Sequence, residues 1–340
     1  MKLISFTVPA YNSEEYLEKC VNSLLPGGED VEIIIVNDGS TDNTLAIARK
    51  LEAEYPKVIR IVDKPNGGHG SGVNAGLDIA EGLYFKVVDS DDWLDSSALA
   101  ALLENIKVRL AEDTLPDLYI TNFVYDHATD GTHISEYSGK MAENTLIGWE
   151  KVKSFRFSHM MLMHSLTYRT ENLRESGVRL PEHTFYVDNL FAYAPLPHMR
   201  KLCYLNINLY HYFIGRADQS VNIKNIVARY AQQQRVMLLM TQAFSKREIS
   251  RFPKGLKKYA WHSLKVIMMN TVFFTCAEDS PQRRQSMREL KKSIKLSDKR
   301  LYGKLRHGTY LAIIFLLPWR LRGRAMTAGY RYLCKKVKLG

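Results

Sequence analysis

Residues 84–95 read Y-F-K-V-V-D-S-D-D-W-L-D. A short run of β-forming residues ends abruptly in four carboxylates, Asp89, Asp91, Asp92 and Asp95. Like charges this close together raise one another's pKa and oppose folding, so the cluster needs a compensating partner. A divalent cation would supply one, because Mg²⁺ is commonly held by one or two carboxylates together with substrate phosphates. In an alternative interpretation, Asp89 and Asp92 cap the next helix and Asp95 is solvated.

The segments around this run alternate between strand-like and helix-like patterns. Asn12 followed by Glu15 resembles a capping box that opens a helix. The residues 31–36, V-E-I-I-I-V, are typical of a buried parallel strand. Strands are predicted over 2–8, 31–36, 58–62, 84–88 and 118–124, and helices over 12–25, 41–55, 71–80 and 96–110. This alternation predicts a doubly wound, mostly parallel α/β sheet with helices on both faces.

The rest of the chain changes character along its length. Residues 126–148 are polar and rich in Gly, Ser and Thr, and we expect a loop there; a strand is predicted over 202–212. Helix patterns dominate after residue 221, with candidates over 223–244, 256–274, 282–294 and roughly 301–338. We therefore expect two domains, residues 1–220 and residues 221–340.

Charge divides the chain at the same place. Residues 1–220 contain 20 Lys and Arg against 31 Asp and Glu, whereas residues 221–340 contain 27 against 5. This asymmetry predicts an acidic globular unit joined to a segment that meets a polyanion. The apolar run 310–319 is too short to span a bilayer, but its basic flanks favour a helix lying on an anionic membrane surface. A platform for an anionic polymer acceptor and a helical packing or oligomerisation unit are the alternatives.

The termini and cysteines bear on the compartment. The apolar N-terminal run stops at Pro9 without a small-residue cleavage site, so we expect no secretory signal peptide. The four cysteines are far apart in sequence, which favours neither a zinc site nor a disulfide scaffold and fits a reducing compartment.

A glycine-rich loop supports a competing hypothesis. Residues 70–75, G-S-G-V-N-A, fit the G-x-G-x-x-A dinucleotide fingerprint. That fingerprint normally follows the first strand, whereas this one follows the third. The alternative is a turn that feeds a helix N-terminus, which can face phosphate without binding a dinucleotide.

Four loops, taken together, resemble those of the family-2 glycosyltransferases with the GT-A fold. They are V-P-A-Y-N (8–12), V-N-D-G-S-T-D (36–42), N-G-G-H-G-S-G-V-N-A-G (66–76) and V-V-D-S-D-D-W (87–93). The resemblance continues more loosely through F-Y-V-D-N-L-F (185–191) and Y-H-Y-F-I-G-R-A-D-Q-S-V (210–221). Two positions depart from the family's pattern: Val187 stands where an acidic residue often precedes the base, and Val73 stands where an Arg is common.

The resemblance implies a role for each matching position. Asp188 would be the general base, and Asp91 would ligate a Mg²⁺ or Mn²⁺ ion, with His211 as a further metal or phosphate contact; a hydrogen-bonded core histidine is the alternative for His211. Asp38 would accept a hydrogen bond from the base, usually uracil. The nucleotide-sugar site would comprise Pro9, Ala10, Tyr11, Asp38, Gly68, Asp89, Ser90, Arg216 and Ser220.

The implied activity is inverting, metal-dependent transfer of a hexosyl or N-acetylhexosaminyl group from a UDP-sugar. The acceptor would be a hydroxyl of a glycan or lipid-linked molecule in cell-surface polysaccharide synthesis. We expect a cytoplasmic protein, peripheral at the inner face of the membrane, with no nucleic-acid partner and with oligomerisation open. Two other classes remain: a different nucleotide-binding α/β enzyme (a nucleotidyltransferase or NAD-binding protein) and a non-catalytic protein that binds polyanions or membranes.

Overall fold

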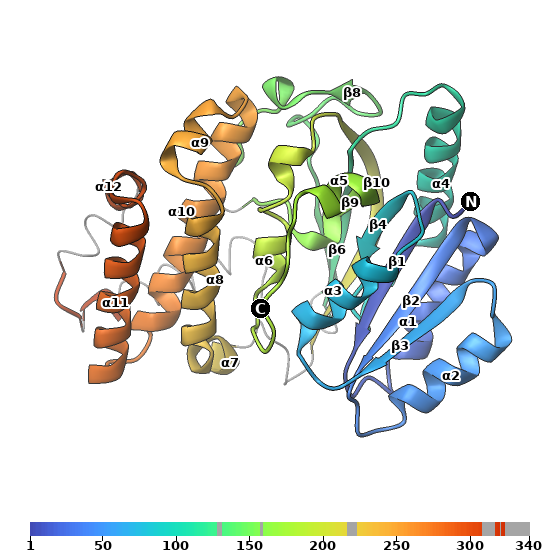
Figure 1. Cartoon of the computed structure of the whole chain (residues 1–340), viewed down its shortest axis with the longest axis horizontal. Helices are drawn as coiled ribbons and strands as arrows, with labels where there is room; N and C mark the ends of the chain where they lie inside the picture. The colour runs from blue at the N-terminus through green and yellow to red at the C-terminus, as the bar shows by residue number, and fades with distance from the viewer. Residues whose placement is uncertain (128–130, 157–158, 216–222, 308–316, 320, 324–340) are drawn as a thin grey trace. The chain divides into compact units, whose positions relative to one another are not determined.

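The computed structural model describes the chain except residues 128–130, 157–158, 216–222, 308–316, 320 and 324–340 (Figure 1). The chain divides into two compact units. The first comprises residues 1–153 and 161–215, and the second comprises residues 154–160 and 216–340. The predicted domain boundary at residue 220 falls in a segment outside the described residues.

The first unit is built on one mixed sheet. Among the described residues its strand order is β3-β2-β1-β4-β9-β6-β10-β5, with β7 paired to β6 and β8 paired to β10. The strands are β1 (Ile4–Ala10), β2 (Val31–Asp38), β3 (Ile59–Lys64), β4 (Tyr84–Val87), β5 (Trp93–Leu94), β6 (Leu118–His127), β7 (Gly131–Ser135), β8 (Leu146–Ile147), β9 (Leu166–Arg169) and β10 (Leu202–Ile214).

Parallel pairing dominates the part of the sheet that positions the site. Strand β1 pairs in parallel with β2 and β4, and β2 pairs in parallel with β3. Strand β9 runs antiparallel to both β4 and β6, and β6 pairs in parallel with β10. Because β1, β2 and β4 are parallel, their carboxyl ends meet at one edge, which is where ligands bind in open α/β sheets.

Helices cover both faces of this sheet. Phe6 and Val8 of β1 belong to an apolar cluster with residues of α1 and α4, whereas Thr7 faces Gly76 of α3. Alternate residues of a strand point to opposite faces, so these contacts place α1 and α4 on one side and α3 on the other. The helices are α1 (Leu17–Leu24), α2 (Thr44–Glu54), α3 (His69–Ile79), α4 (Ser96–Ala111), α5 (Thr170–Glu175) and α6 (Asp188–Phe191).

Two local predictions for this unit were wrong. Asn12 is not a helix cap: its φ is 48°, its side chain accepts a hydrogen bond from the Thr41 backbone N–H at 2.8 Å, and α1 begins only at Leu17. Residues 126–148 are not all loop, since they contain the end of β6 and all of β7 and β8. Strand β7 is mostly exposed and polar, so it lacks the apolar alternation by which strands are recognised.

The second unit is helical in the residues described. Its helices are α7 (Ile223–Ala228), α8 (Tyr230–Ala243), α9 (Lys246–Arg251), α10 (Lys254–Cys276), α11 (Pro281–Ser297) and α12 (Lys299–His307). The predicted helix over 223–244 is divided at Arg229, and most of the predicted 301–338 helix lies outside the described residues. No described helix combines the length and the apolar character needed to cross a bilayer.

Candidate active site

Hydrogen bonds hold three predicted loops together at the carboxyl edge of the sheet. The Ser13 hydroxyl lies 2.8 Å from the Ser90 hydroxyl, which ties the loop after β1 to the carboxylate loop after β4. The Ser13 backbone N–H donates to the Thr44 hydroxyl at 2.7 Å, which ties the same loop to the one after β2. Ser90 is therefore buried, and its hydroxyl connects the loop after β4 to the loop after β1.

The predicted base-binding residues end strand β1. Pro9 and Ala10 are buried and lie opposite Val36 and Asn37 of β2. Tyr11 follows directly and is 53% exposed. An exposed aromatic ring at this edge is available for stacking on a flat ligand such as a nucleobase.

Asp38 is buried and fixes the glycine loop. One carboxylate oxygen accepts from the Lys64 ammonium at 2.7 Å and from the Gly67 N–H at 2.9 Å, and the other accepts from the Gly68 N–H at 2.7 Å. The predicted Asp38 thus lies at the site, and its carboxylate organises the loop that follows β3.

Close packing explains the glycines of that loop. Gly68 has a φ of 83°, and a Cβ added to it would lie 3.2 Å from the His183 backbone N. At Gly70 an added Cβ would lie 2.9 Å from both Leu180 Cβ and Pro181 O, closer than real contacts allow. Asn74 exchanges two hydrogen bonds with the Leu180 backbone, at 2.9 and 3.0 Å. The glycines therefore admit the segment 180–187, which leads directly to Asp188.

An ion pair lies between the glycine loop and the carboxylate loop. His69 Nε2, at the start of α3, is 2.8 Å from Asp89 Oδ1. Burial alone would lower the pKa of His69, but the Asp89 carboxylate raises it above the usual value. Burial alone would raise the pKa of Asp89, but the His69 ring lowers it below its usual value. The pair thus holds a negative carboxylate and a positive ring together.

Asp188 lies at the start of α6, in the same electrostatic environment. Burial raises the pKa of its carboxyl to about 6, and the charges of His69 and Asp89 lower and raise it respectively. Tyr186, two residues earlier, has a φ of 66°, a left-handed conformation that is uncommon for an aromatic residue. Such local strain is often found next to functional groups.

The remaining carboxylates of the cluster have separate partners. Asp92 is buried and accepts from the Tyr210 hydroxyl at 2.5 Å and from the Phe213 N–H at 2.8 Å. Asp95 caps α4 by accepting from the Ala98 N–H at 2.8 Å. The alternative that assigned capping to Asp89 and Asp92 was therefore wrong, because the cap is the acid immediately before the helix.

A histidine that the sequence did not single out completes this cluster. Ligand atoms of Asp89, Asp92 and His164 lie within 4.8 Å of one another. His164 is buried, and in the described structure neither of its ring nitrogens has a hydrogen-bond partner. Burial lowers its pKa to about 4, which leaves the neutral imidazole that can ligate a metal. The two carboxylates and the imidazole of this group are suitable ligands for a divalent cation. Asp91, which is half-buried, lies between Asp89 and Asp92 in the same loop.

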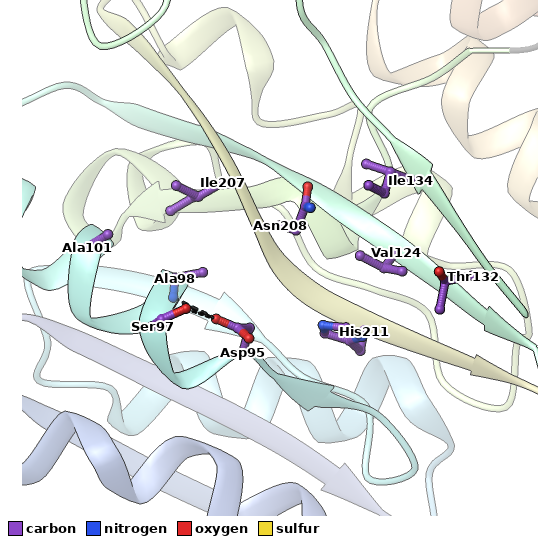
Figure 2. A pocket seen from close by; sticks show the side chains of 10 residues that line it. All are labelled: Asp95, Ser97, Ala98, Ala101, Val124, Thr132, Ile134, Ile207, Asn208 and His211. Carbon is purple, nitrogen blue, oxygen red and sulfur yellow. Dashed lines mark hydrogen bonds between the residues drawn. The ribbon is translucent and has the colours of Figure 1, made fainter.

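The structure does not bring His211 into this group. Its Nδ1 lies 3.2 Å from Asp126 Oδ2, and its ring stacks on Trp93 with centroids 5.3 Å apart. His211, on β10, lines a pocket of about 580 Å³. Figure 2 shows its side chain together with those of Asp95 and Ser97 at the start of α4. The other lining residues are Ala98, Ala101, Val124, Thr132, Ile134, Ile207 and Asn208. Arg216 and Ser220 lie outside the described residues.

Comparison with known proteins identifies the family. Residues 5–167 match the model of glycosyl transferase family 2, and 254 residues are 30% identical to the chondroitin synthase of Pasteurella multocida (strain Pm70). The chain belongs to this family. The aligned region covers 74% of the chain but 24% of that synthase, so the chain spans about a quarter of the curated relative's length.

Solved structures confirm the predicted GT-A-like fold. Staphylococcus aureus TarS 1–349 in complex with UDP-GlcNAc superposes with a TM-score of 0.65 at 18% identity, covering 98% of this chain and 92% of that one. Mannosyltransferase PcManGT from Pyrobaculum calidifontis, in complex with GDP-Man and Mn²⁺, gives a TM-score of 0.53 at 14% identity, covering 95% and 86%.

Proposed function

We propose that this chain is an inverting glycosyltransferase that moves a sugar from a UDP-sugar to a hydroxyl of a glycan or lipid-linked acceptor in surface polysaccharide synthesis. The observation that carries the proposal is the half-buried carboxyl of Asp188 near the His69–Asp89 pair, at the end of the segment that packs against the glycine loop. Family membership and the three joined loops at the sheet edge support it.

Asp188 suits the task of a general base. A hydroxyl is a poor nucleophile and needs a base within hydrogen-bond reach whose pKa is near the working pH. With a pKa of about 6, Asp188 is mostly ionised at pH 7 yet binds a proton more strongly than an ordinary aspartate. A base on the face of the sugar opposite the leaving diphosphate gives a single displacement with inversion.

The donor would lie along the joined loops. Tyr11 offers an exposed ring to the base beside Pro9 and Ala10, and Asp38 and Gly68 border the same edge. TarS, which shares the fold, binds UDP-GlcNAc, and this supports a UDP-sugar as donor here. We include Ser90, Arg216 and Ser220 in the donor site on the family resemblance.

A Mg²⁺ or Mn²⁺ ion would be held by the carboxylate loop. The described residues that fit it are Asp89, Asp92 and His164. Asp91 lies in the same loop, whereas His211 is bonded to Asp126 instead. When bound, the ion supplies positive charge that stabilises the leaving diphosphate. The orphaned nitrogens of His164 support this assignment, as does the Mn²⁺ bound by PcManGT.

The basic second unit would place the enzyme at the inner face of the membrane. Excess positive charge attracts protein segments to anionic lipid. A peripheral attachment of this kind would bring the active site to a lipid-linked acceptor.

Calorimetric titration of UDP and GDP, each with and without Mn²⁺, tests the proposal on the wild type and on Asp91→Ala. We expect UDP to bind only with Mn²⁺ and binding to be lost in the variant. GDP binding in preference to UDP would overturn the donor assignment, and UDP binding that ignores both Mn²⁺ and Asp91→Ala would overturn the metal assignment.

A further inference from the structure

Four lysines of the second unit form a group that the proposed reaction does not use. We call Lys246, Lys257, Lys265 and Lys304 the lysine cluster. Lys257 and Lys265 lie on α10 with Trp261 midway between them. Residues four apart lie on one helix face, so these three side chains form a stripe along α10. The two lysines are about 12 Å apart along the helix axis at 1.5 Å per residue.

Two other helices bring further lysines to this stripe. The ammonium of Lys304, on α12, lies 3.9 Å from the centroid of the Trp261 ring. Lys246 is the first residue of α9, and its backbone N–H donates a hydrogen bond of 2.7 Å to Asp298. Asp298 is the residue immediately before α12. Three helices therefore converge, with two lysines from α10 and one each from α9 and α12.

The lysine cluster is only partly balanced by a carboxylate: burial raises the pKa of Asp298, but backbone hydrogen bonds and then the charge of Lys246 lower it. Within the described residues, none of the four lysines forms an ion pair. Asp298, the acid next to Lys246, accepts instead from the backbone N–H groups of Lys246, Arg300 and Leu301. Burial and then the charges of Lys265, Lys246 and Lys257 lower the pKa of Lys304. Repulsion among like charges costs stability that a bound anion would restore.

We propose that the lysine cluster binds the acidic groups of an anionic polysaccharide. A spread of about 12 Å along one helix suits a chain with repeated acidic groups better than one small anion. A lipid surface fits less well, because membrane-binding faces combine basic residues with exposed apolar ones. The apolar residue at the centre of this cluster, Trp261, is only 7% exposed and is covered by Lys304. The site stands whether or not the donor is a UDP-sugar.

The test compares two double variants of α10 in the full chain. Lys257→Gln/Lys265→Gln removes two charges of the lysine cluster, and Lys254→Gln/Lys258→Gln removes two exposed charges outside it. The probe is dextran sulfate, with uncharged dextran of equal length as reference. We expect the wild type to bind dextran sulfate but not uncharged dextran. Binding of dextran sulfate should be at least tenfold weaker in the first variant and less than twofold weaker in the second.

Three results would overturn the proposal. One is no binding of dextran sulfate by the wild type, and another is equal weakening in both variants, which would show that overall charge alone attracts the polymer. The third is unchanged dextran sulfate binding with lost binding to phosphatidylglycerol vesicles, which would make the stripe a membrane site. Circular dichroism verifies the fold of each variant, and UDP titration reports separately on the donor site.

Discussion

Each unit of this protein contains a cluster of like charges, carboxylates in the first unit and lysines in the second. The two clusters differ in how their charged groups are bonded to the rest of the protein. The carboxylates of the first unit are tied down by the protein itself: His69 pairs with Asp89, while Tyr210 and a backbone N–H bind Asp92. None of the four lysines of the second unit's lysine cluster forms an ion pair with a carboxylate in the described structure, although the charge of Lys246 acts on nearby Asp298. The difference indicates that the first group is preorganised for a small ligand, whereas the second is open to a large one.

The largest expected effect on this comparison comes from replacing His164, the neutral residue that lies among the carboxylates of the first unit. His164→Gln takes away the imidazole that lies with Asp89 and Asp92. We expect Mn²⁺ affinity to fall about 10- to 100-fold, as for other groups that support a metal site. His211→Gln serves as the matched control, because His211 bonds to Asp126 instead. Equal losses in both, measured by Mn²⁺ titration, would place both histidines at the metal, and loss only in His211→Gln would refute the role of His164.

The pH dependence of the reaction sharpens the same point. The pKa of Asp188 is raised to about 6, so the base loses its charge as the pH falls through that value. We expect kcat/KM to fall about tenfold from pH 7 to pH 5, since one unit below the pKa leaves about a tenth of the base ionised. Initial rates over this range at constant ionic strength measure it. A flat profile down to pH 5 would contradict the assigned base.

A smaller effect separates packing from chemistry in the glycine loop. Gly70→Ala places a methyl group 2.9 Å from Leu180 Cβ and Pro181 O, and overpacking of this kind typically costs about 1–3 kcal/mol. We expect a lower urea midpoint and slower turnover, because the displaced segment leads to Asp188. Gly303→Ala in α12, where nothing lies within 4 Å, should be neutral or slightly stabilising. Unchanged stability in Gly70→Ala would mean that the segment is not packed as described.

The sequence predicted the sheet and most of the loops because these depend on local patterns. The β-branched run 31–36 and the acids after residue 88 can be recognised without knowing their neighbours. Partners distant in sequence could not be predicted. Lys86 in β4 is fully buried and donates to the His164 carbonyl, 78 residues away, at 2.6 Å. No periodicity marks His164, and it enters the site only because β9 inserts between β4 and β6.

The glycine loop is a second example of contacts between residues distant in sequence that a local pattern cannot predict. Its pattern was compatible with a dinucleotide fingerprint, a phosphate-facing turn or a donor loop. The structure shows what the pattern could not: Gly68 and Gly70 make room for residues 180–184, which lie more than 100 positions later in the chain. Spacing alone reveals a need for small residues but not the backbone that approaches them.

The most direct test of the central claim is UDP release by wild type and Asp188→Asn from a panel of UDP-hexoses and UDP-N-acetylhexosamines with Mn²⁺. Asparagine keeps the size of the side chain but cannot accept the hydroxyl proton, so we expect kcat to fall about 10²- to 10⁴-fold. UDP affinity, measured in parallel, should change less than twofold. A variant that keeps wild-type turnover would contradict Asp188 as the base, and a wild type that releases UDP from no member of the panel would contradict the proposed reaction itself.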